Sequence, residues 1–466
     1  MNVYETPYNQ IDFVILAPRF RIVFSCMSDK NVAFVREYLL RLLYLTPCKP
    51  EQIAHYFGFN HYETEVSLED LARNKWILWT DDGTVEISSE GMKLFHGSND
   101  DSPKIPSLNE YGGEYRMELL DNNFLLKKDC DSESQHAIKV PVESRVQSEC
   151  NETARKVFQS RFRQLCEDDI IQLDAKDTAL YKIDVIETKG SPVYFRFTQK
   201  FELFPATGES KERHDIVNLL FQDNIQKAVT ELLAQFRSAD NLHELSKSME
   251  ALGCNFLRKI LFGGKLDFLE FLNEKHKREQ QSGMCFLGQI YHQEDVFEKI
   301  NTILNDLDKN AVNPDRKLLW LVPNDIYWGK QKKIHDKVQS LVEQQSKGYK
   351  LRLYLPLSKK RTKHEIDGWR YQFKDIQDDI LFGFCEGFLD GNTEILFLKN
   401  KFAVVCYHIK LSGYPVTLPL GYLTTKLSEV KGIEKLANSY LNSTLRSFKD
   451  NNDIQKDFGI LRNLVD

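Results

Sequence analysis

Apolar residues in the first hundred positions recur at the three- and four-residue spacing that is typical of helices, and two strand-like runs lie before them. Pro50 suits the first position of a helix, and Asn60 suits the cap before another. Gly83, after two aspartates, indicates a hairpin turn. The expected elements are strands over 11–16 and 20–24, helices over 31–44, 50–57 and 60–75, strands over 76–79 and 84–87, and a helix over 90–95.

The middle of the chain alternates apolar and polar positions and then returns to helical spacing. Lys189-Gly190-Ser191 indicates a hairpin between two of the expected strands. The expected elements are a polar linker over 102–109, strands over 115–120, 137–142, 180–188 and 192–203, a helix over 152–167, and a helical region over 212–280. This β-rich domain is expected over 110–210, and the helical region is assigned to 211–282.

From residue 284 onward, strands and helices alternate. The run at 318–322 is apolar throughout, which indicates a strand that is buried on both faces. The expected strands are 284–290, 318–322, 351–357, 380–388, 395–398 and 402–407, with helices over 293–307 and 330–343. The fold class is therefore multidomain α+β, with domains over 1–98, 110–210, 211–282 and 283–466, the last of them α/β with a C-terminal helix.

The order helix, turn, helix, helix and two-stranded wing over 29–95 resembles a winged-helix domain. In that family the third helix usually enters the DNA major groove. The matching residues here are acidic: Glu63, Glu65, Glu69 and Asp70 in the helix, and Asp81 and Asp82 at the tip of the wing. These charges repel phosphate, so we expect the module to dock a partner protein. A sequence-specific transcription regulator is the alternative.

The composition is that of a globular protein, with 42% hydrophobic and 28% charged residues. Nine cysteines without a CxxC pair indicate buried thiols in a reducing compartment, and no metal or other cofactor is expected. The N-terminus has no signal-peptide pattern, and no apolar run reaches about 18 residues. We therefore expect a cytoplasmic protein without membrane contact.

Charge is distributed unevenly along the chain. The net charge is −6, yet residues 330–374 hold thirteen Lys and Arg against four Asp and Glu, a balance of +9 that leaves −15 elsewhere. Basic and aromatic side chains together are typical of nucleic-acid binding. The predicted binding residues are Lys330, Lys332, Lys333, Lys337, Lys350, Arg352, Lys359, Lys360, Arg361, Lys363, Trp369 and Arg370. The solvated face of an amphipathic helix is the alternative interpretation.

The apolar strand over 317–323, a helix, and the segment Gly348–Pro356 resemble part of a phospholipase D-like domain, over roughly 284–424. That resemblance implies a histidine two residues before a lysine: the histidine attacks phosphorus and the lysine neutralises phosphate charge. The motif is expected just before residues 395–405, where Asn392-Thr393-Glu394 stands instead. His408 and Lys410 have the right spacing, but they follow the expected strand, and no carboxylate comes after them.

No nucleotide-binding, zinc-protease or serine-hydrolase motif is present. We therefore expect a non-catalytic subunit that binds a partner protein and nucleic acid. The two resemblances together imply an intracellular DNA-processing or anti-phage defence complex. The alternative enzyme is a phospholipase D-like nuclease with a divergent active site.

Overall fold

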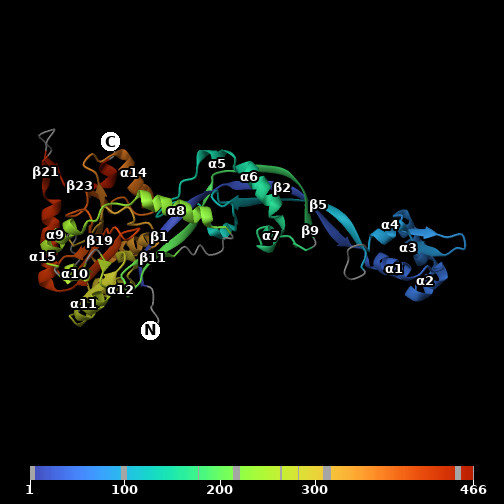
Figure 1. The fold of residues 1–466 in the computed structure, drawn as a ribbon, viewed down its shortest axis with the longest axis horizontal. Helices are drawn as coiled ribbons and strands as arrows, with labels where there is room; N and C mark the ends of the chain where they lie inside the picture. The colour runs from blue at the N-terminus through green and yellow to red at the C-terminus, as the bar shows by residue number, and fades with distance from the viewer. Residues whose placement is uncertain are drawn as a thin grey trace.

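The computed structural model describes residues 6–95, 102–176, 178–213, 221–254, 256–262, 265–281, 283–307, 316–446 and 453–464. The chain is a mixed α/β protein with several sheets and a multidomain arrangement. Figure 1 shows an elongated molecule: a small unit lies at one end, long strands form an arm, and a larger α/β domain lies at the other end. We call residues 34–95 the tip module.

The tip module has the predicted order of elements. They are α1 (Phe34–Leu45), α2 (Pro50–Phe57), α3 (His61–Arg73), β3 (Ile77–Trp79), β4 (Val85–Ile87) and α4 (Ser89–Lys93). Pro50 begins α2 as expected. The Asn60 side chain accepts a hydrogen bond from the Glu63 N–H, and the Glu63 carboxylate accepts one from the Asn60 N–H, both at 2.9 Å. This capping box fixes the start of α3.

Two long strands carry the tip module. β2 (Arg19–Asn31) leads into the module and β5 (Lys104–Met117) leads out of it, and they pair from Arg19 opposite Arg116 to Asn31 opposite Lys104. β9 (Thr178–Thr188) pairs with the other edge of β2. The linker expected over 102–109 is wrong for residues 104–109, which form the first part of β5. Alternation of exposed and half-buried positions, not apolar content, marks this stretch as strand.

The base of the arm is a second sheet around β1 (Thr6–Ala17), which pairs with β10 (Val193–Leu203). The two N-terminal strands therefore belong to the arm and do not pack within the helical tip. Helices α6 (Cys150–Ser160) and α7 (Phe162–Glu167) cover one face of the arm, where Phe158 and Phe162 pack on Phe24. The remaining elements of the arm and its base are β6 (Phe124–Leu125), β7 (Cys130–Asp131), β8 (Ile138–Lys139), α5 (Ser144–Ser148) and β11 (Ser210–Arg213).

The C-terminal domain is built on an eight-stranded mixed sheet of order β14-β20-β19-β18-β15-β16-β17-β23. The strands are β14 (Met284–Leu287), β15 (Lys317–Leu321), β16 (Lys350–Leu357), β17 (Leu381–Cys385), β18 (Thr393–Leu398), β19 (Phe402–Ile409), β20 (Leu418–Thr424) and β23 (Asp457–Ile460). β15, β16 and β17 run parallel, while β18, β19 and β20 are antiparallel to their neighbours. All the strands predicted beyond residue 284 are present.

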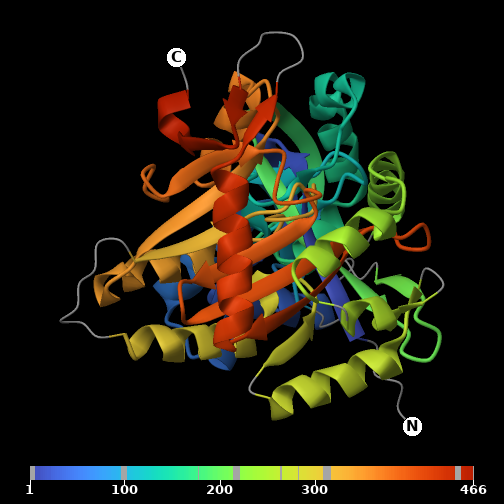
Figure 2. The same cartoon turned by 90° about the vertical axis from the view of Figure 1, so that its left-hand side faces the viewer.

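Helices cover both faces of this sheet. On one face lie α12 (Glu294–Asn305), α13 (Lys333–Glu343) and α14 (Lys363–Gln372), packed on residues such as Leu318 and Leu396. The opposite face meets α15 (Leu427–Leu441), which crosses the sheet in Figure 2. The predicted helical region supplies α8 (Asp223–Gln235), α9 (Leu242–Ala251), α10 (Phe256–Ile260) and α11 (Phe268–Gln280), although residues 214–220 lie outside the described part. The prediction is wrong between α10 and α11, where β12 (Leu261–Phe262) pairs with β13 (Lys265–Leu266).

One apolar core joins the base of the arm to the C-terminal domain, because residues of β1 and β10 share it with β18, β19 and β20. Two hydrogen bonds reinforce the junction: the Asp12 N–H donates to the Lys330 carbonyl at 2.7 Å, and the Asn9 amide donates to the Thr417 carbonyl at 2.9 Å. No helix within the described residues is long and apolar enough to cross a membrane.

Candidate functional site

Polar side chains meet at one edge of the C-terminal sheet. This edge holds the carboxyl ends of the parallel strands β15, β16 and β17, where ligand sites of open α/β sheets usually lie. β18 begins there and β19 ends there, because each runs antiparallel to its neighbour. The edge therefore gathers Asp325 after β15, Glu394 in β18, His408 in β19 and Thr417 before β20.

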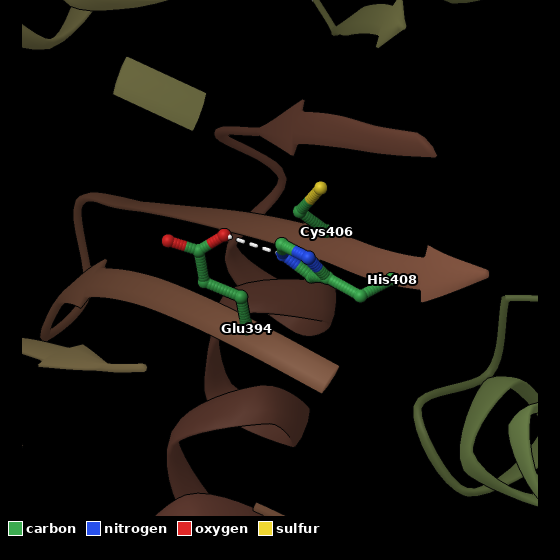
Figure 3. A group of neighbouring side chains, drawn as sticks. All are labelled: Glu394, Cys406 and His408. Carbon is green, nitrogen blue, oxygen red and sulfur yellow. Dashed lines mark hydrogen bonds and ion pairs between the residues drawn. The ribbon is translucent and has the colours of Figure 1, made fainter. Parts of the chain in front are cut away.

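His408 lies between two carboxyl groups. Its Nδ1 is 2.7 Å from an Asp325 oxygen, and its Nε2 is 3.0 Å from a Glu394 oxygen, as Figure 3 shows for Glu394. All three side chains are almost completely buried, with at most 1% exposed. Since both ring nitrogens face acceptors, the geometry favours the doubly protonated imidazolium.

Glu394 accepts hydrogen bonds from two tryptophans through its other oxygen. The indole N–H groups of Trp320 and Trp328 lie 2.7 and 2.9 Å from that oxygen. Asp325 is held in a similar way, by the Thr417 hydroxyl at 2.8 Å and the Tyr327 backbone N–H at 3.1 Å. Each carboxyl group therefore meets donors only, which suits the ionised form.

Burial and pairing act in opposite directions on this network. Burial alone disfavours the charged forms, but the bonds to Asp325, Cys406 and Glu394 raise the pKa of His408 well above its usual value. Burial also opposes ionisation of Asp325, yet its bonds from His408 and Thr417 hold the Asp325 pKa below the ordinary range. Asp325 is therefore negatively charged and His408 positively charged, so that the net charge of the pair is zero.

Cys406 lies beside this network. It is the cross-strand partner of Glu394, and it points to the same face of β19 as His408, two residues later. Burial raises the pKa of the Cys406 thiol to about 11, although the nearby His408 acts to lower it. Glu394, Cys406 and His408 each offer one ligand atom, and these three atoms lie within 4.8 Å of one another.

The sequence placed His408 after the strand and found no carboxylate for it. The structure corrects both points: β19 extends to Ile409, and the carboxylates come from β18 and from the loop after β15. Lys410 does not join the network. Its N–H bonds to the Asn241 side chain, and it lines a surface hollow of about 130 Å³ together with Asp325 and Thr417.

Little in the sequence identifies Asp325, Trp320 and Trp328 as residues of this site. Asp325 follows a buried strand, which is a common place for polar site residues, but its pairing with His408 spans 83 positions. In the sequence, Glu394 stands where the phospholipase D-like resemblance implies a lysine. The type of residue is the better signal of a site. A carboxylate inside an otherwise apolar strand such as β18 is buried only where hydrogen-bond or charge partners surround it.

The predicted basic segment divides into two groups. The first surrounds α13: Lys332 pairs with Asp131, and both Lys333 and Lys337 pair with Glu294. Lys330 is half-buried before α13, where burial lowers its pKa and Asp325 opposes that shift. The carboxylates of neighbouring elements thus offset much of this group's positive charge.

The second group lies on β16 and in the loop that joins it to α14. Lys359 pairs with Glu386, and Arg370 pairs with Asp378. Lys360, Arg361 and Lys363 are exposed in the loop and at the start of α14. Lys350 is exposed at the start of β16, and the Arg352 guanidinium lies over the Phe382 ring. The Trp369 indole N–H donates to the Pro356 carbonyl at 3.1 Å, and its ring packs against Trp328 and Phe373.

A surface that the sequence did not reveal lies on the tip module. Helix α1 buries Leu39, Leu40 and Leu43 against α3 and the hairpin. Its opposite face is also apolar: Phe34 is 73% exposed and Leu45 is 81% exposed, with Tyr38 between them on the same side. The helix sequence does carry a signal of this surface, because apolar residues cover more of α1 than one core-facing stripe requires.

The same surface continues onto other elements of the module. Among the described residues, eleven of the twenty-one exposed large hydrophobic side chains lie in the tip module. They are Phe34, Val35, Tyr38, Tyr44, Leu45, Tyr56, Tyr62, Val66, Leu78, Trp79 and Met92. On α3, Tyr62, Glu65, Val66 and Glu69 share one face, because they stand at positions i, i+3, i+4 and i+7.

In comparisons with known proteins, no family model matches this chain, and no curated protein matches its sequence.

Proposed function

We propose that this chain is a non-catalytic adaptor whose tip module is a winged-helix domain that docks a partner protein. One observation carries the proposal: α1 has two apolar faces, and only one of them is covered by the chain itself. A helix that is apolar all round is normally buried on all sides. The outward face of α1 is therefore a contact surface that another molecule covers.

The position of the module supports this role. β2 and β5 hold it at the far end of the arm, away from the large apolar core of the C-terminal domain (Figure 1). Exposed apolar patches of this kind mark interaction sites in soluble proteins. Tyrosine, tryptophan and phenylalanine are also the side chains enriched at protein interfaces.

The charge of the module supports a basic partner surface. Glu65 and Glu69 flank Tyr62 and Val66 on α3, and Asp81 and Asp82 form the turn of the wing. Asp70 is already bound by Arg36 through two hydrogen bonds of 2.5 and 2.9 Å. A partner with apolar side chains ringed by lysine or arginine complements this surface, whereas a phosphate backbone is repelled by it.

The test is purification of the tagged full chain from its native cells, with nuclease added. Tyr38→Ser with Leu45→Ser should lower recovery of the partner about 30-fold, as expected for loss of interface anchors. Glu65→Lys with Glu69→Lys should lower it by repulsion. The exposed arm variant Tyr181→Ser is the control and should bind as the parent does. Equal recovery with all variants contradicts the proposal, and recovery lost only with nuclease favours a DNA-binding regulator.

The absence of catalysis is also part of the proposal. His408 is the histidine nearest to the expected motif, and both of its ring nitrogens are bonded to carboxyl groups inside a closed core. A nucleophile needs a free nitrogen lone pair and access to substrate. Incubation with DNA and RNA, with and without divalent metal, should give no cleavage. Specific cleavage that is lost in a folded His408→Ala variant would contradict this.

We also propose nucleic-acid binding through the basic loop over 359–363, where Lys360 and Lys363 extend from the C-terminal domain without an acidic partner among the described residues. This loop lies at the end of β16, at the same sheet edge as the His408 network. With a partner protein at one end and nucleic acid at the other, the chain would act as a subunit of an intracellular DNA-processing or anti-phage complex, as the family resemblances imply.

A further inference from the structure

We propose that Glu394, Cys406 and His408 form a binding site for a divalent transition metal ion, with Zn²⁺ as the best-suited ion. Their ligand atoms lie within 4.8 Å of one another on two paired strands, and Figure 3 shows the three side chains close together, with Glu394 and His408 joined by a hydrogen bond. Among the described residues, this is the one such group of three. The proposal is independent of partner docking by the tip module.

The ligand set selects the class of ion. Thiolate and imidazole ligands favour Zn²⁺ and similar transition metals, whereas Mg²⁺ and Ca²⁺ require oxygen ligands. The 3.0 Å separation of His408 Nε2 and the Glu394 oxygen is a hydrogen-bond distance, and it needs to widen only to about 3.4 Å for both atoms to bind one tetrahedral ion at about 2.0–2.2 Å. Three protein ligands leave the fourth tetrahedral position to a water molecule.

The groups that orient metal ligands are already in place. Asp325 accepts from His408 Nδ1 at 2.7 Å, which leaves Nε2 toward Glu394. A carboxylate on the far nitrogen of a ligating histidine is the usual outer-shell arrangement at zinc sites. The indoles of Trp320 and Trp328 hold the other Glu394 oxygen and leave the ligating oxygen toward His408.

Uptake of a metal ion at this site can be balanced by release of protons. Without metal, ionised Asp325 and Glu394 and protonated His408 give a net charge of about −1 in a buried space. Binding of M²⁺ breaks the Nε2–H bond of His408 and the S–H bond of Cys406, and both protons leave to solvent. The ion then bonds to Nε2, Sγ and the Glu394 oxygen. Two protons are exchanged for two positive charges, so the buried net charge is unchanged.

The test uses the full chain, stripped with a chelator and loaded with Co²⁺ or Zn²⁺. Cobalt reports a thiolate ligand through a sulfur-to-metal charge-transfer absorption. The parent should bind one ion per chain and show this band. Cys406→Ala should lower the affinity more than 100-fold and remove the band. Cys385→Ala, which deletes another buried thiol of the same sheet in β17, is the matched control and should bind as the parent does.

Three results would overturn the site: no ion bound by the parent at micromolar Co²⁺ or Zn²⁺, a cobalt spectrum without the sulfur band, or equal affinity in the Cys406→Ala variant. The first two are measured on the parent alone, so they hold even if Cys406→Ala fails to fold. Millimolar Mg²⁺ should not displace the bound ion, and displacement would show an oxygen-ligand site elsewhere.

Discussion

The tip module and the C-terminal domain break the usual distribution of side chains in opposite directions. The tip exposes apolar residues such as Phe34 and Leu45, whereas the C-terminal domain buries the charged groups of Asp325, Glu394 and His408. In the tip, a small core cannot cover both faces of α1. In the C-terminal domain, these charged groups are buried at the sheet edge where α/β proteins often hold an open ligand site.

The difference separates a surface that needs a partner from a site that is too enclosed for a macromolecular substrate. An exposed apolar face gains free energy only when another molecule covers it. A buried charged network is satisfied internally, and its removal affects the chain itself before any ligand. Changes in the tip should therefore alter binding, and changes at the network should alter stability.

The largest expected effect is on stability, from His408→Ala. It leaves two buried carboxylates facing each other without a cation, and we expect the free energy of unfolding to fall by about 3–5 kcal/mol. Denaturant titration followed by tryptophan fluorescence measures it, since Trp320 and Trp328 border the network. The exposed His364→Ala should change stability by less than about 0.5 kcal/mol. An equal small effect from both variants would refute the ionic network.

A pair of leucines on α1 separates binding from folding within one helix. Leu43 is buried and Leu45 is exposed. Leu43→Ala should lower the free energy of unfolding by about 2–5 kcal/mol. Leu45→Ala should leave stability unchanged within about 0.5 kcal/mol and weaken partner binding. Thermal unfolding of the two variants measures the contrast, and a destabilised Leu45→Ala would show that α1 is covered by the chain itself.

A histidine that is buried without a carboxylate partner sharpens the contrast with His408. Burial lowers the pKa of His136 to about 4, although its hydrogen bond to the Gly329 carbonyl acts to raise the pKa. Because the pKa of His136 is lower in the folded chain than in the unfolded chain, the unfolded chain binds a proton first as the pH falls. Stability is therefore present above about pH 6.5 and is lost as pH falls toward 4, by up to about 3 kcal/mol.

His136→Asn removes this titration, and asparagine tolerates the left-handed backbone at this position, where φ is +51°. Unfolding measured at pH 7 and pH 4 should therefore show a smaller acid loss in His136→Asn than in the parent, whereas His364→Asn should match the parent. An unchanged acid loss in His136→Asn would place the titrating group elsewhere.

The smallest expected effect concerns the basic loop. Replacing Lys359, Lys360, Arg361 and Lys363 with alanine should weaken nucleic-acid binding for all sequences. It should flatten the log–log salt dependence by up to about three, since each phosphate that the loop neutralises adds roughly 0.7–0.9 to the slope. Fluorescence anisotropy at several salt concentrations measures it. If the slope is unchanged, the loop is a solvated surface and the tip is the better candidate for binding other molecules.

The sequence predicted local elements better than their assembly. Asn60, Pro50 and Gly83 marked element boundaries because capping and turn geometry depend on a few neighbouring residues. The pairing of β2 with β5 was missed because the strands are separated by the whole tip module. The site was missed for the same reason, since Asp325 and His408 meet only when β15, β18 and β19 assemble in one sheet.

The central claim is that another protein covers the outward face of α1. A photo-crosslinking amino acid at position 45, in the full chain in its native cells, tests this most directly, with the same residue at the exposed arm position 181 as control. Position 45 is expected to crosslink to one protein, at a peptide containing lysine or arginine, and position 181 is expected to give no such crosslink. Crosslinks from position 45 only to this chain or to DNA, or none at all, would contradict the account.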